Sequence, residues 1–222
     1  MATLAFPSIR PPGSATLQLV GSTQRHVSPF DGSAQTVGRP AQLWRASMTW
    51  GPIPHTEWRV LQSFIAELRG MSGRFTYSHP HTFRMATAAI GTPLVKGADQ
   101  SGVSLLADGF TAGATVMRRG DFFSLADPPG RARMYVVKAD VVADGSGNAT
   151  LTFSPPLRSS PPDNLAINLA TPSPIWMLAS DDEGAVTWSA QHVMRAGFTL
   201  NIVEALFGSA DGLFTLDGSV LG

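Results

Sequence analysis

The sequence predicts a mainly β protein, with a β-sandwich domain that carries one packed α-helix and a second, smaller β-domain inserted into it. Apolar and polar residues alternate along several short runs, as they do in half-buried strands. Glycine (22 residues) and proline (17) punctuate these runs, whereas charged residues make up only 14% of the chain. Only one segment repeats its apolar residues at helical spacing.

The first strands are expected before residue 50. Residues 15–20 alternate, and residues 25–27 either extend that strand or begin the next. The run Pro29–Ser33 (PFDGS) is typical of a tight turn, and strands are predicted on its far side over 34–37 and 42–50. One face of the last strand is apolar and is therefore expected to face a core. Its residues are Trp44, Ala46, Met48 and Trp50.

The helix is predicted over residues 56–69, with Thr56 as its N-cap and Gly70 ending it. Glu57 and Arg69 then lie at the helix ends whose partial charges they complement. An apolar stripe is expected to pack on a sheet, with Leu61 and either Ile65 or Phe64 buried. The stripe consists of Trp58, Leu61, Phe64, Ile65 and Leu68. A short strand over 74–77 is expected to return from the helix.

Between about Met85 and Ser180 the sequence indicates glycine-rich β-structure without a helix. Strands are predicted at 134–137 and 150–153, on either side of a turn at Asp144–Asn148. A new β-run begins at Thr187, and residues 198–203 alternate again. The predicted boundaries follow from these changes in character: a host domain of residues 1–84 and 185–207, an inserted β-domain of 86–182, and a C-terminal arm of 208–222.

Composition excludes several classes of chemistry. The 222 residues have a formal net charge of +0 and a pI near 7.0, so no global affinity for nucleic acid or anionic membrane is indicated. Cysteine is absent, which removes disulfides and thiol catalysis. Residues 1–7 lack the basic start and apolar run of a signal peptide, and no stretch is apolar enough to span a bilayer. We expect a protein made in a cytoplasm, with no membrane insertion.

Two groups of residues are weak candidates for metal binding. His79 and His81 could share one ion, but the neighbouring sequence supplies no third ligand for zinc, and a turn with surface histidines is the preferred interpretation. Asp140, Asp144 and Asn148 offer oxygen ligands for calcium, but they lack the EF-hand spacing and fit a hairpin turn better. We therefore predict no metal and no cofactor.

No catalytic set is nominated either. The G-x-S-x-G, G-x-G-x-x-G and Walker motifs are all absent, and Gly145-Ser146-Gly147 lacks the third glycine and the helix that a phosphate site needs. Nothing marks a pair of carboxylates for glycoside hydrolysis. Tryptophans could line a sugar site, but their strand and helix contexts favour a core or an interface. The glutamates considered for hydrolysis are Glu57, Glu67, Glu183 and Glu204. The tryptophans considered for a sugar site are Trp44, Trp50, Trp58, Trp176 and Trp188.

The order of several short motifs resembles that of the distal tail (baseplate-hub) proteins of long-tailed bacteriophages. The resemblance spans most of the chain, and it depends on the order of pieces that are individually unspecific. In the first part these are Gln24, Pro29–Gln35, Arg39-Pro40, Trp44-Arg45, the Trp58–Leu68 helix and Gly73–Phe75. In the second they are Gly109-Phe110, Gly120–Phe122, Tyr135–Val137, Asp144–Thr150, Pro156–Arg158, Phe198–Leu200 and Glu204–Leu206.

The resemblance implies a non-enzymatic virion protein, made in the bacterial host cytoplasm and located at the tail tip. It implies a hexameric ring that binds the last ring of the tail-tube protein and the hub or fibre proteins below it, with a channel through which DNA passes. A tail-tube protein is the nearest alternative. A different class, a host-surface carbohydrate- or receptor-binding module, would use exposed aromatics and the acidic loop Asp181–Glu183. A cell-wall hydrolase ranks third.

Overall fold

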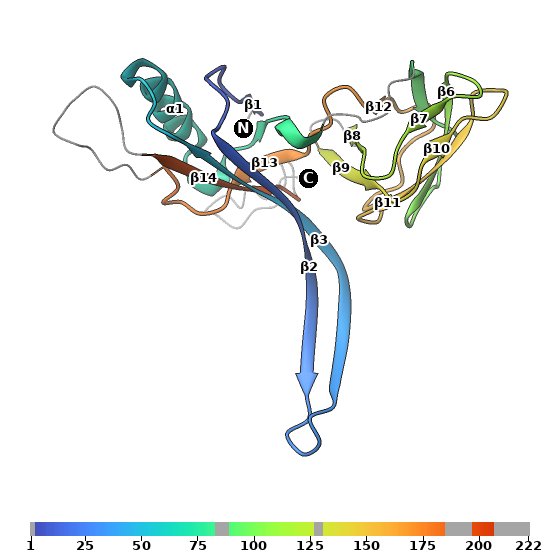
Figure 1. Ribbon diagram of the computed structural model, residues 1–222, viewed down its shortest axis with the longest axis horizontal. Coiled ribbons are helices and arrows are strands. Elements are labelled where there is room, and N and C mark those ends of the chain that lie inside the picture. Colours follow the sequence, from blue (N-terminus) through green and yellow to red (C-terminus); the bar gives the residue numbers. More distant parts are fainter. Residues whose placement is uncertain (1–2, 83–88, 127–130, 185–196, 207–222) are drawn as a thin grey trace, which may run out of the picture. The chain divides into compact units, whose positions relative to one another are not determined.

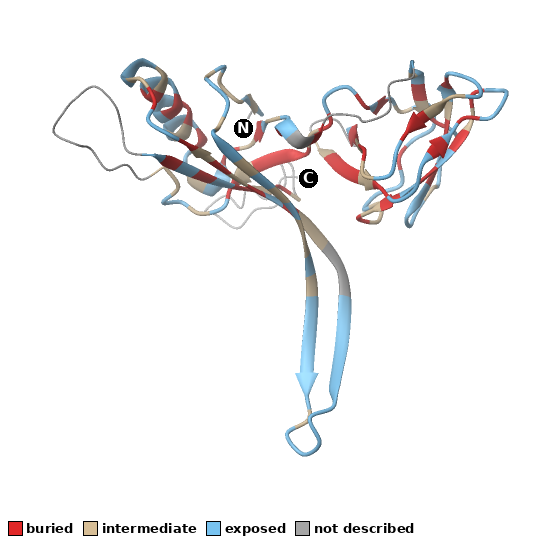
Figure 2. Ribbon diagram, in the orientation of Figure 1, coloured by how far each residue is buried: buried red, intermediate tan, exposed pale blue. Residues whose placement is uncertain are grey.

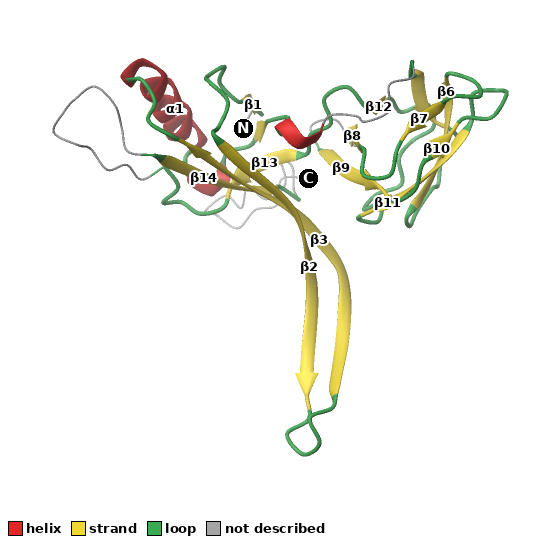
Figure 3. Cartoon of the chain, in the orientation of Figure 1, coloured by secondary structure: helices red, strands yellow, loops and turns green. Residues whose placement is uncertain are grey.

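The computed structural model describes residues 3–82, 89–126, 131–184 and 197–206, without the side chains of residues 39–41 and 81. The chain is mainly β with one α-helix and several sheets, which confirms the predicted fold class (Figure 3). It divides into two compact units. The first comprises Met1–Ala15, Ser47–Tyr77 and Pro174–Gly222, and the second comprises Thr16–Ala46 and Ser78–Ser173.

One sheet of six strands contains the strands of the first unit, and its strands β3 and β2 also contain residues of the second unit (Figure 1). β1 runs parallel to β4, whereas β13 is antiparallel to both β4 and β14. β3 and β2 follow β14, so that β2 is the outermost strand. The strands in sheet order are β1 (Leu4–Ala5), β4 (Phe75–Thr76), β13 (Ile175–Leu178), β14 (Phe198–Glu204), β3 (Ala34–Trp50) and β2 (Ser14–Val27).

The predicted core face of β3 is confirmed. Trp44, Ala46, Met48 and Trp50 are all buried, at 4%, 5%, 0% and 1% exposure. The two strands predicted over 34–37 and 42–50 are, however, one continuous strand. Gly38 and Pro40 lie between the two predicted segments, but an extended backbone tolerates both where the strand is not central to a sheet.

Helix α1 (His55–Leu68) buries the predicted apolar stripe against the sheet of the first unit. Trp58 meets Phe198 of β14 edge-on at 5.2 Å between ring centroids, and Phe64 meets Phe75 of β4 at 5.3 Å. Leu61 is fully buried, whereas Ile65 is only half-buried. These aromatic contacts join helix and sheet into one core.

The observed caps differ from the predicted ones at both ends of α1. The N-cap is Pro54 rather than Thr56: the carbonyl of Pro54 accepts a hydrogen bond from Trp58 N at 3.0 Å, and Thr56 already lies in the first turn. Pro54 has φ −59°, which the pyrrolidine ring fixes and which directs the chain into the helix. At the other end Arg69, not a glycine, is the first left-handed residue, with φ 53°. The short 3₁₀ segment η1 (Gly70–Ser72) follows.

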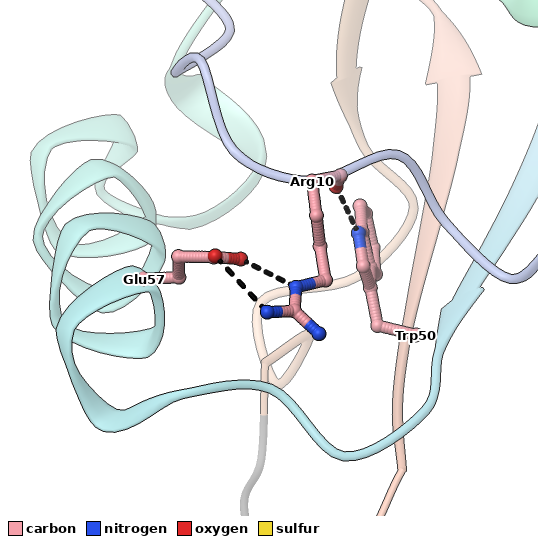
Figure 4. A network of polar contacts seen from close by, with 3 residues as sticks. All are labelled: Arg10, Trp50 and Glu57. Carbon is pink, nitrogen blue, oxygen red and sulfur yellow. Dashed lines mark hydrogen bonds and ion pairs between the residues drawn. The ribbon is translucent and has the colours of Figure 1, made fainter.

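The start of α1 is fastened to the N-terminal segment (Figure 4). Arg10 Nε donates to Glu57 Oε2 at 2.9 Å, and the indole of Trp50 donates to the carbonyl of Arg10 at 3.0 Å. The hydrogen bond from Arg10 holds the pKa of Glu57 below its usual value. Because this ion pair is partly open to solvent, it orients the segment more than it stabilises the fold.

The second unit contains an antiparallel sheet whose outer strands meet. Leu94 of β5 forms a bridge with Ala166, and Val95 N donates to Leu165 O at 2.9 Å, so the sheet closes into a small barrel. A separate pair, β7 (Thr115–Met117) and β10 (Val141–Val142), lies beside it in the unit. The sheet runs in the order β12 (Ile167–Asn168), β8 (Phe122–Ala126), β9 (Ala132–Val137), β11 (Ala149–Ser154), β6 (Ser104–Phe110) and β5 (Gly91–Val95).

An aromatic cluster fills this barrel. Phe123, Tyr135 and Phe153 pack with ring centroids 5.1–5.3 Å apart, and the surrounding apolar side chains all come from residues 90–169. The apolar core of the barrel is therefore made within one stretch of chain, although the second unit also includes Thr16–Ala46.

The predicted end of the inserted domain at residue 182 is too late. Residues 175–178, which that boundary includes, form β13 of the first sheet, between β4 and β14. A run of four apolar residues fits the core of either unit, so periodicity could not assign it. The β-run predicted from Thr187 and the C-terminal arm 208–222 lie outside the described residues.

Candidate interaction surface: the β2–β3 hairpin

The β2–β3 hairpin is longer than the sheet that holds its base. β2 has 14 residues and β3 has 17, whereas the neighbouring β14 has only 7. β14 runs beside the end of β3, where Thr199 Oγ1 lies 3.1 Å from Thr49 Oγ1. The first part of β3 therefore extends past its neighbour in the sheet.

The far half of the hairpin has no core face. From Thr23 to Gly38 every residue is exposed except Ser28, which is half-buried (Figure 2). Alternation in burial stops where the polar run Thr23–His26 begins. Because an isolated two-stranded ribbon is at best marginally stable in water, a ribbon exposed on both faces calls for a covering partner.

The outer edge of β2 is also open. Among the described strands β2 pairs only with β3, so one row of its backbone N–H and C=O groups faces outward. Proteins usually protect such an edge with proline, lysine or a bulge. β2 contains no proline or lysine, and its one fully charged residue is Arg25. This edge therefore lacks two of these protections and offers a template for strand pairing.

The turn at the tip is held by its own hydrogen bonds. Ser28 N donates to Ser33 O at 2.8 Å, and Gly32 N donates to Ser28 O at 3.1 Å. Asp31 Oδ1 accepts from Ser33 N at 3.0 Å and from Ser33 Oγ at 2.8 Å. Hydrogen bonds from the Ser28 hydroxyl first, and then from Ser33, lower the pKa of Asp31 to about 2. Phe30 stands in this turn with 97% of its surface exposed.

Trp44 anchors the middle of β3 within the second unit. Its indole donates to the carbonyl of Met134 at 2.8 Å, and its ring meets Phe122 at 5.6 Å. Close by, Gln42 and Ser154 are joined by their side chains at 3.2 Å, and Arg158 donates to the Gln42 carbonyl. The contacts of Gln42 and Trp44 thus hold β3 in place near the start of the exposed part of the hairpin.

Of the residues weighed for calcium binding, Asp144 and Asn148 are joined by hydrogen bonds, whereas Asp140 bonds elsewhere. Asp140 accepts from the Arg119 amide, whereas Asp144 accepts from the amides of Ser146 and Asn148 inside a hairpin turn. The hydrogen bond from the Asn148 side chain lowers the pKa of Asp144 most. Among the described residues no group of three or more His, Asp or Glu side chains could hold a metal ion.

Of the two histidines weighed for metal binding, His79 is part of a buried turn. His79 is buried at 2% exposure, beside the 3₁₀ turn η2 (Pro80–Thr82), and its carbonyl accepts from the Thr82 hydroxyl at 2.7 Å. A surface position, as the sequence suggested, is therefore wrong for His79. The side chain of His81 lies outside the description.

The acidic loop makes contacts within its own unit. Asp181 accepts from the Met71 amide at 2.8 Å, and Glu183 accepts from the Asn201 amide at 2.9 Å. Asp182 bonds to the Ser180 hydroxyl, which lowers its pKa. These carboxylates position loops, which weakens the case for a receptor site here.

The described tryptophans are buried, as predicted for core residues. Trp44, Trp50, Trp58 and Trp176 are each no more than 4% exposed, and Trp188 lies outside the described residues. Phe30, which the sequence presented only as part of a turn motif, is instead the most exposed aromatic residue among those that the structure describes. The polar character of both flanking strands, without an apolar face, was the signal that could have drawn attention to it.

The comparisons add no relative: no family model matches the chain, and no curated protein matches it. No helix in the described ranges is long and apolar enough to cross a membrane.

Proposed function

We propose that this chain is a structural protein of a bacteriophage virion that forms a hexameric ring at the distal end of the tail tube. In this role it joins the tube protein to the baseplate hub or fibre proteins and leaves a channel for DNA. The proposal is supported by the resemblance in motif order and by the mainly β fold with one packed helix. The observation that carries it is the exposed hairpin.

A ring needs two different complementary surfaces on each subunit, because its contacts are head-to-tail. The hairpin offers two. One is the open outer edge of β2, and the other is the part of β3 that extends beyond β14. If the edge of one copy pairs with the ribbon of the next, the backbone groups are satisfied and the pairing repeats around a closed ring.

The charge of the outer part of the hairpin suits a channel through which DNA must pass. Residues 21–38 contain one arginine and one aspartate, and otherwise mainly serine, threonine, glutamine and glycine. A surface with many Lys or Arg side chains would bind DNA phosphates tightly and in a salt-dependent way. A near-neutral polar ribbon would make only weak contact with DNA.

The receptor-binding alternative has less support. The four described tryptophans are buried, and the carboxylates of the acidic loop are engaged within their unit. A glycan array with the full chain tests this alternative directly, since selective binding would favour adhesion over scaffolding.

The proposed location is tested by labelling. A gold-conjugated antibody against this protein should mark particles at the distal end of the tail, and antibody adsorbed with the purified protein serves as the control. Label on the capsid would contradict the proposal. Absence of label would also contradict it, if the particles are intact and the antibody can reach the tail tip.

A further inference from the structure

The tip of the hairpin presents an aromatic side chain that its own chain does not cover. Phe30 is 97% exposed, whereas the other large apolar side chains that are exposed in the described ranges reach 41–60%. A phenyl ring in water is a source of binding free energy for any surface that can cover it. Aromatic side chains that are inserted in this way are typical anchors of protein interfaces.

The backbone around Phe30 is already ordered for binding. Phe30 N donates to Ser28 Oγ at 3.3 Å, and the Ser28–Ser33 backbone bond closes the turn below it. Asp31 is fixed by Ser33, so both neighbours of the ring are held in place. Binding would therefore cost little ordering of the loop, which favours a tight contact.

The charge of the tip favours a protein surface over a lipid bilayer. Asp31 follows Phe30 directly, and its carboxylate is fully exposed and ionised at neutral pH. The turn Ser28–Ser33 contains no lysine or arginine that could bind anionic headgroups. A permanent carboxylate next to the ring opposes insertion into hydrocarbon.

Three properties of the same arm point to a second copy of this chain as the partner. The ten residue steps of β3 from Ala34 at the turn to Trp44 span roughly 33 Å, which exceeds the radius of gyration of roughly 13 Å for a domain of 100 residues. The open edge of β2 lies on the same arm, and a second copy supplies equivalent edges in return. The chain has a formal net charge of +0, so copies meet without overall repulsion.

We infer that Phe30 is the anchor by which the hairpin of one copy docks on the next copy. The inference rests on the proposed ring in one respect, because it names the residue that joins neighbouring subunits. It adds a chemical requirement: the position must carry an apolar side chain, and the receiving surface belongs to this same chain.

Photo-crosslinking tests the partner. A photoreactive phenylalanine analogue replaces Phe30, and the purified full chain is irradiated as a mixture of normal and heavy-isotope copies. We expect crosslinked peptides that join residue 30 of one isotope to a peptide of the other. The inference is overturned if no such peptide forms even at millimolar protein concentration. It is equally overturned if the probe labels only phosphatidylglycerol vesicles, or only a different protein in assembled particles.

Substitution tests the chemistry. Phe30→Ser should weaken self-association, followed by sedimentation or by yield of crosslinked dimer, roughly tenfold to a hundredfold. Phe30→Leu should restore most of it. Val60→Ser is the matched control, because Val60 is an exposed apolar residue (49%) on α1 rather than on the arm. Unchanged thermal unfolding of Phe30→Ser would show that the fold is intact, and equal losses in both serine variants would refute a specific anchor.

The outcomes separate this inference from the proposed function. Crosslinking between copies in the purified protein, together with absence of the protein from tail tips, would keep the anchor and remove the tail role. A ring at the tail tip in which residue 30 crosslinks only to another protein would keep the tail role and remove the anchor.

Discussion

At the scale of single residues, the hairpin tip shows how a few polar groups fix a turn. The Asp31 carboxylate accepts two bonds from Ser33, and Ser28 contributes the largest part of its lowered pKa. Because the folded pKa lies below 3.8, the usual value for an aspartate, the ionised form stabilises the turn. That contribution is complete above the unfolded pKa and is lost as the pH falls towards 2.

The first prediction concerns this titration. Followed by NMR, the Asp31 carboxyl should titrate with a pKa of about 2, and the Ser33 amide should report the same midpoint. Asp31→Asn, which cannot titrate, is the control and should leave the Ser33 amide unresponsive over this range. A midpoint near 3.8 would mean that the turn is not formed in solution.

The second prediction concerns the anchor at the base of the arm. Trp44→Phe removes the indole N–H that donates to Met134 O, and leaves that buried carbonyl without this donor. The change should lower the unfolding free energy of the second unit by about 1–3 kcal/mol. Arg45→Lys, at the adjacent exposed position, is the control for denaturant unfolding. Equal stability of both variants and wild type would contradict the contact.

At the scale of elements, helix α1 stabilises the first unit through one stripe. Leu61→Asp places a charge at a position with 0% exposure, against the sheet. We expect a loss on the order of 4 kcal/mol in unfolding free energy. Gln62→Asp puts the same charge on the exposed side of the same helix and should change little. Thermal unfolding of Leu61→Asp at the wild-type temperature would refute the assigned helix face.

The elements differ in how far sequence could predict them. The stripe of α1 and the core face of Trp44–Trp50 follow from local periodicity, and the structure confirms both. The helix caps were missed because Pro54 and Arg69 occupy positions usually taken by other residue types. The sheet to which β13 belongs was missed because four apolar residues carry no information about distant partners.

The candidate surface was the least predictable element. The PFDGS turn was expected from its composition, and it lies where predicted. The exposure of the hairpin was not predicted. The pattern of a strand shows whether its two faces differ in polarity, but it does not show whether a neighbouring element covers them. Only the loss of alternation at Thr23–His26 signals that neither face meets a core.

At the scale of the whole molecule, the two units have separate cores. The apolar cluster of the barrel is drawn from residues 90–169 alone. Residues 78–173 expressed by themselves should therefore fold into a soluble β-rich domain that unfolds cooperatively. A circular dichroism spectrum of a disordered chain would show instead that the barrel depends on the hairpin base around Trp44.

We propose that copies of this protein join through their hairpins into a ring at the end of a phage tail. The most direct measurement is an electron cryo-microscopy reconstruction of the distal end of the assembled tail. We expect a six-fold ring of this chain, with the outer edge of β2 paired to the hairpin of the adjacent copy and Phe30 buried between them. A reconstruction in which this chain is absent from the tail end, or in which the hairpins remain free in solvent, would contradict it.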